Sequence, residues 1–181
     1  MEVFSIGFIL IAYVLVRLLL GHHHTNTMRD RKIYKTYIKQ VANKEYRSTL
    51  AKIDKILSIK PKSAICWALK AECHLGLGEY YQAILYADKA LHLDYTLSEL
   101  YFHKGIAYLH LNQITQALIE FDKTIWHTRD QHAVAYYHKG LVLLSFQEYD
   151  KAILAFERSA KLGNEQANYE LLCLRNQKQI V

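Results

Sequence analysis

The sequence predicts an all-α protein, a solenoid of repeated helix–turn–helix units preceded by a single transmembrane helix. Three observations lead to this fold class. The 181 residues include only seven glycines and one proline, too few for a loop-rich β-sandwich or a disordered chain. Three long segments align with one another at a period of 34 or 35 residues, which is typical of repeat proteins. The chain also carries a long apolar run over residues 3–20.

This apolar run is the first predicted element. At a rise of 1.5 Å per residue, residues 3–20 are about long enough to cross the ~30 Å hydrocarbon core of a bilayer. A cleaved signal peptide fits poorly, because no Lys or Arg precedes the run and no small-residue cleavage site follows it. We therefore expect a transmembrane anchor at residues 3–20 and a linker at residues 21–29.

The positive charge of the chain is concentrated directly after the anchor. The formal net charge is +6, and residues 25–60 hold ten Lys or Arg against three Asp or Glu. The positive-inside rule then places residues 21–181 in the cytoplasm. We interpret this basic flank as a topology signal whose surface lies against anionic lipid. The alternative is a docking surface for an acidic protein. Nucleic-acid binding is disfavoured, because the rest of the chain is nearly neutral. Its first residues are Arg29, Arg31, Lys32, Lys35 and Lys39.

The three aligned segments begin at Ala64, Ser98 and Ala133. Each contains a bulky aromatic residue, a small residue four positions later and a second small residue further on. In chain order these markers are Trp67, Ala71 and Ala83, then Tyr101, Gly105 and Ala117, then Tyr136, Gly140 and Ala152. Apolar residues recur at three- and four-residue spacing between them, which predicts amphipathic helices. One such helix pair cannot bury its apolar face alone, so the units must stack.

This pattern resembles the tetratricopeptide repeat family, whose 34-residue unit is a helix–turn–helix. The resemblance implies repeats over residues 64–97, 98–132 and 133–166, with turns at Gly78, Asn112 and Gln147. The closing proline of the family pattern is absent from all three repeats, but Pro61 matches it in a degenerate, basic unit over residues 30–63, whose second helix we expect at about 45–60. Residues 165–178 would form the capping helix that a solenoid end requires.

The resemblance also implies a ligand groove lined by the first helix of each unit. Its lining is more apolar and aromatic than charged, which suits an amphipathic helix or a hydrophobic peptide. The family's clamp for acidic peptide termini uses Lys, Asn and Arg, and it is missing here. The alternative interpretation is that the C-terminal helix covers Phe102 and Leu141, which would leave no open groove. The groove candidates are Ala68, Glu72, Glu99, Phe102, Ile106, His110, Tyr137, Leu141 and Leu144.

Residues with catalytic or metal-binding chemistry do not form a known motif in this sequence. There is no Ser–His–Asp order, phosphate-cradling Gly-rich loop or HExxH. The three cysteines are interpreted as packing residues in a reducing compartment. His103 and His138 occupy the same position in successive repeats, as copied surface residues or, alternatively, as a metal or proton-transfer pair. We expect no enzyme activity, cofactor or metal site.

The predicted function is a membrane-anchored, cytoplasm-facing scaffold or adaptor that recruits or assembles partner proteins through its repeat groove. Anchoring a binding module raises its local concentration at the membrane without adding contacts. Two alternatives remain. One is a periplasmic or lumenal assembly factor of an envelope machine, with the opposite topology. The other is a metal-handling or enzyme accessory subunit that uses the repeated histidines.

Overall fold

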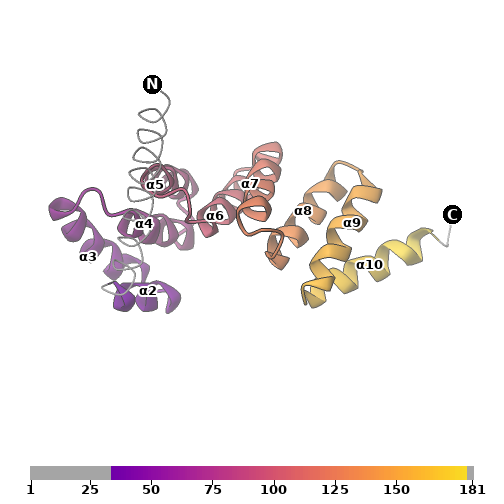
Figure 1. The fold of residues 1–181 in the computed structure, drawn as a ribbon, viewed down its shortest axis with the longest axis horizontal. Helices are drawn as coiled ribbons and strands as arrows, with labels where there is room; N and C mark the ends of the chain where they lie inside the picture. The colour runs from indigo at the N-terminus through magenta and orange to yellow at the C-terminus, as the bar shows by residue number, and fades with distance from the viewer. Residues whose placement is uncertain (1–33, 179–181) are drawn as a thin grey trace, which may run out of the picture.

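The computed structural model of this protein describes residues 34–178, which form nine α-helices and no strand. Successive helices pack against one another, from α2 at one end of the molecule to α10 at the other (Figure 1). The predicted all-α repeat solenoid is confirmed for these residues. The helices are α2 (Lys35–Ala42), α3 (Tyr46–Ile59), α4 (Ala64–Gly76), α5 (Tyr80–Leu93), α6 (Glu99–His110), α7 (Ile114–His127), α8 (Ala133–Ser145), α9 (Tyr149–Lys161) and α10 (Glu165–Lys178).

Four helix hairpins, α2–α3, α4–α5, α6–α7 and α8–α9, turn in the same way. One residue in each turn has a left-handed backbone: φ is +63° at Lys44, +77° at Gly78, +57° at Asn112 and +60° at Gln147. The next amide donates a hydrogen bond to the carbonyl five residues back, a Schellman ending, with N···O distances of 2.8–3.0 Å. Only Gly78 adopts this conformation without steric cost, so the other turns carry about 1 kcal/mol of strain each.

Within two hairpins, a glycine of the first helix lets an aromatic ring of the second helix approach its backbone. A Cβ atom added at Gly105 or Gly140 would lie 2.5 Å from the ring of Phe121 or Phe156, respectively. Both rings are fully buried. The markers Gly105 and Gly140 are therefore sites of close helix approach, because a larger residue leaves no space for the ring.

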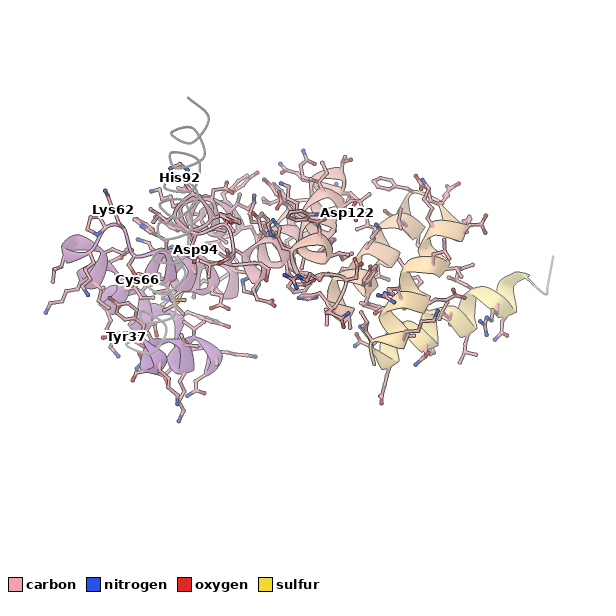
Figure 2. The ribbon with its side chains drawn as sticks, in the orientation of Figure 1. Tyr37, Lys62, Cys66, His92, Asp94 and Asp122 are labelled. Atoms are coloured by element: carbon pink, nitrogen blue, oxygen red, sulfur yellow. The ribbon has the colours of Figure 1, made fainter. Side chains whose placement is uncertain are left out.

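Ion pairs join each hairpin to the next. A Lys of α4, α6 or α8 forms an ion pair with an Asp of the second helix in the preceding hairpin. Figure 2 labels one of these Asp residues, Asp122 of α7. The Lys positions and the Asp positions are each spaced by the repeat period, so the same ion pair is repeated at each junction between hairpins. The pairs are Lys70–Asp54 at 2.5 Å, Lys104–Asp88 at 2.8 Å and Lys139–Asp122 at 2.6 Å.

Lys104 is the buried member of this ladder. Its ammonium also contacts the buried carboxylate of Glu120, with Nζ and Oε1 3.2 Å apart. Burial alone would lower the pKa of Lys104, but the hydrogen bond to Asp88 and the charges of Glu120 and Asp88 outweigh it and raise that pKa. The charged form is therefore stabilised at this junction, because buried charges persist only when they are paired.

The first and last parts of the solenoid differ from its centre. The buried side chains of α3 are Thr49, Ile53 and Leu57, and α3 spans Tyr46–Ile59, where the period predicts a second helix. At the other end, α10 packs Leu171 and Leu174 into a cluster with residues of α8 and α9. No further helix follows α10 within the described residues.

The predicted anchor at 3–20, the linker at 21–29 and the flank residues Arg29, Arg31 and Lys32 lie outside the described residues. Within residues 34–178, none of the helices is both long and apolar enough to cross a membrane. Of the basic flank, Lys35 and Lys39 lie exposed on α2.

Candidate functional site

Two adjoining cavities lie along the first helices of the N-terminal hairpins. Their volumes are about 370 and 340 Å³, and both are lined by Ile38 of α2, Glu72 of α4 and His103 of α6. Ala68 and Glu99, two further predicted groove residues, line the larger one. We call the two cavities together the N-terminal groove. It is the place where the structure brings predicted site residues of different helices together.

Two glutamates supply the negative charge of the N-terminal groove. Oε1 of Glu72 lies 3.8 Å from Nε2 of His103, and Oε2 of Glu99 lies 3.4 Å from Nε2 of His132. The Nδ1 atom of His132 accepts a hydrogen bond from the amide of Ala135 at 3.0 Å. The proton of a neutral His132 therefore lies on Nε2, facing Glu99, because one ring nitrogen must accept while the other donates.

Phe102 lies beside the N-terminal groove in a cluster of aromatic rings. Its ring centroid is 5.9 Å from Phe121, 4.9 Å from His132 and 5.7 Å from His138. Burial, and then the nearby His132, lower the pKa of His138, because a charged imidazole loses its hydration there. Phe102 is thus half-buried between α6, α7 and α8 and does not lie beneath α10.

The predicted groove residues of α8 lie at the other end, against α10. Tyr137, Leu141 and Leu144 are half-buried on the cluster that contains Leu171 and Leu174. Burial raises the pKa of Tyr137, and so does Glu170 of α10, which accepts a hydrogen bond from its hydroxyl group. The capping helix therefore occupies this part of the surface.

Two other predicted groove residues of α6 have structural neighbours of their own. Ile106 packs on the cluster formed by Phe121, Ala117 and Val142. The ring of His110 stacks on Tyr80 with centroids 4.5 Å apart, beside the turn where α6 ends. Of the nine residues predicted to line one continuous groove, the structure gathers Ala68, Glu72 and Glu99 in a single cavity.

Sequence reasoning missed several groove residues. Leu97 and Ile65 line the larger cavity, and His132 contacts Glu99. Leu97 and His132 lie 35 residues apart, just before α6 and α8. Because the two residues occupy the same position in successive repeats, the sequence could have indicated that both line the groove side of the first helices.

A third cavity, of about 420 Å³, lies between α7, α8 and α9. Charged side chains in its wall pair with each other: Nζ of Lys139 lies 2.6 Å from Asp122, and Nζ of Lys151 lies 2.5 Å from Glu148. Because each positive charge there faces a negative one, this cavity offers a ligand little electrostatic preference.

The histidines and cysteines do not assemble a metal centre in the described part of the chain. Across residues 34–178, no group of three or more His, Cys, Asp or Glu side chains could hold a metal ion. Cys66 (labelled in Figure 2) and Cys73 are fully buried and form no disulfide. Burial, and then the charge of Glu72, raise the pKa of Cys73 to about 12. Cys73 is thus held as a neutral packing residue.

Comparison with known proteins identifies the architecture. Residues 133–163 match the tetratricopeptide repeat family model, and a crystal structure of MamA superposes with a TM-score of 0.69 at 24% identity, covering 78% of this chain and 83% of that one. Residues 34–178 have the tetratricopeptide repeat fold. The matched repeat comprises α8 and α9 with the turn that follows.

Two further comparisons concern proteins with the same fold. The first tetratricopeptide repeat domain of Spaghetti (RPAP3), bound to the HSP90 peptide SRMEEVD, superposes with a TM-score of 0.58 at 22% identity, covering 64% of this chain and 93% of that one. The SGT1 homolog of Bos taurus is 27% identical over 113 residues, which are 56% of this chain and 33% of the relative. The chain spans a third or less of the length of the curated relatives that it matches.

Proposed function

We propose that this protein is a membrane-anchored scaffold that binds a segment of a partner protein in its N-terminal groove and has no catalytic activity of its own. The observation that carries this proposal is the pair of adjoining cavities along α2, α4 and α6, in a fold that holds a peptide in the RPAP3 structure. Apolar walls with a few charged groups are typical of peptide-binding surfaces. In this proposal the degenerate unit at residues 30–63 completes the groove by supplying Ile38.

Site-specific photo-crosslinking tests the groove as the binding surface. A benzophenone amino acid replaces Ile38, which is exposed and lines both cavities. The matched control carries it at Ile59, which is also exposed but lines neither of them. Illuminated membranes should yield a partner crosslinked from position 38 and absent from position 59, identified by mass spectrometry. Equal yields from both positions, or none from position 38, would contradict the groove.

The membrane part of the proposal rests on residues 3–20 and on the basic residues that follow them. In sucrose-gradient flotation the unchanged protein should rise with the membranes. After deletion of residues 1–24 it should stay in the bottom fractions. The repeat domain should resist protease added to spheroplasts, because the positive flank keeps it on the cytoplasmic side. Digestion of a C-terminal tag by protease added to spheroplasts would instead support the periplasmic or lumenal assembly factor.

A further inference from the structure

The larger cavity of the N-terminal groove has two glutamates between apolar walls. We propose that it selects a partner segment that presents a Lys or Arg side chain between apolar residues. The inference rests on the proposed function and specifies its ligand: a cationic, partly apolar stretch of protein, bound with its positive group toward Glu72 and Glu99. Charge complementarity and the composition of the cavity wall carry it.

The carboxylates and the apolar wall belong to the same cavity. Glu72 and Glu99 both line the 370 Å³ cavity, together with Ile38, Ala68 and Leu97, and among residues 34–178 no Lys or Arg lines it. Lys44 lines the smaller cavity. The side chains of the two glutamates remain 38% and 64% exposed, so a ligand can reach them. A guanidinium or ammonium group between them would form charge-assisted hydrogen bonds while neighbouring apolar residues cover the wall.

Each of the two carboxylates has a histidine nearby. Glu72 faces His103 and Glu99 faces His132, at 3.8 and 3.4 Å. Elsewhere in the solenoid the exposed acids Asp54, Asp88 and Asp122 each face a Lys, and Glu79 faces His74.

An acidic ligand is disfavoured by the same residues. The peptide SRMEEVD in the RPAP3 structure carries two Glu and one Asp, which would approach Glu72 and Glu99 with like charge. Such juxtapositions are costly when they are desolvated at an interface. The groove therefore has the opposite charge preference from a site for acidic peptides.

Selection from a display library of random 12-residue peptides tests this preference on the full chain in detergent micelles. Peptides selected by the unchanged protein should be enriched in Lys or Arg flanked by apolar residues. The same selection on the double variant Glu72→Gln/Glu99→Gln should lose that enrichment. The matched control is Glu165→Gln, which removes an exposed glutamate on α10, outside both cavities, and it should select the same peptides as the unchanged protein.

Fluorescence anisotropy then measures one selected peptide and its copy with Gln in place of each basic residue. Because exposed ion pairs contribute modestly, we expect the basic peptide to bind about 2- to 10-fold more tightly, and the double variant to bind both peptides alike. Selected peptides that are acidic or uncharged, or unchanged enrichment with the double variant, would overturn the ligand assignment while leaving groove binding intact. Failure to select any peptide, or crosslinking of position 38 only to this chain's own basic flank, would overturn the proposed function itself.

Discussion

The close approach of Phe121 to Gly105 allows a quantitative prediction about helix packing. A Cβ atom at Gly105 would lie 2.5, 2.8 and 3.0 Å from three atoms of the Phe121 ring. The ring cannot swing away, because His138 stacks on it at 5.5 Å and Phe102 packs on it at 5.9 Å. Gly105→Ala therefore overpacks the core by about 1–3 kcal/mol, offset by the better helix propensity of Ala, about 1 kcal/mol. We expect a net loss of about 0–2 kcal/mol in the free energy of unfolding.

The sign of this effect should reverse when the ring is removed. Phe121→Ala by itself should cost about 3–5 kcal/mol. In that background, Gly105→Ala gains space for its methyl group and should stabilise the protein by about 1 kcal/mol through helix propensity alone. The two substitutions should thus couple by about 1–3 kcal/mol. The α4–α5 hairpin already has this combination, since Ala71 and Ala87 occupy the two positions and lie in one buried cluster.

Urea unfolding of the four proteins, followed by circular dichroism at 222 nm, measures the cycle. Ala71→Gly provides the matched control, because it involves no ring: it should lose helix propensity, about 0.5–1 kcal/mol, and the burial of one methyl group, about 0.8 kcal/mol. If Phe121→Ala leaves too little folded protein, Phe121→Leu should give coupling of the same sign and smaller size. Stabilisation of the unchanged protein by Gly105→Ala, equal to that in the Phe121→Ala background within about 0.5 kcal/mol, would refute the packing argument.

Three further predictions concern single sites. Gln147 has a φ of +60° and Gly78 one of +77°. Gln147→Gly should therefore raise the free energy of unfolding by about 0.5–1 kcal/mol, and Gly78→Ala should lower it by the same amount. Urea midpoints that shift in the same direction for both variants would contradict this. Since burial raises the pKa of Cys73 to about 12, the native protein at pH 8 should react with a thiol reagent at the half-buried Cys173 and not at Cys73, as peptide mapping would reveal. Because the folded pKa of His138 is lowered, the unfolded chain binds its proton more readily, and stability should fall as the pH drops below about 6.5. His138→Gln should lose less stability between pH 7.5 and 5.5 than the unchanged protein, and an equal loss in both would contradict the assignment.

The features that sequence reasoning predicted best are those that depend on near neighbours along the chain. The turns at Gly78, Asn112 and Gln147 have the left-handed backbone that a tight hairpin needs. The small residues Ala83, Ala117 and Ala152 are buried. Such positions recur at the repeat period because every hairpin closes in the same way, so one aligned segment reports on the others.

The candidate site was predicted less completely. Glu72 of α4 and Glu99 of α6 line one cavity. Tyr137 and Leu141 occupy equivalent positions but lie against α10. Repeat periodicity treats all units as equal, and it cannot show which unit the terminal helix covers.

The sequence by itself determined the class of fold, the helix–turn–helix period and the concentration of positive charge after residues 3–20, because composition and local spacing control these properties. Tertiary structure decided which charges meet. Asp88 and Lys104 are separated by 16 residues and form an ion pair across a hairpin junction, while Glu72 and Glu99 are left facing histidines in a cavity. The physical reason is that stacking angles bring together side chains from neighbouring hairpins, and only the packed solenoid determines whether a charge meets its opposite, a histidine or a ligand.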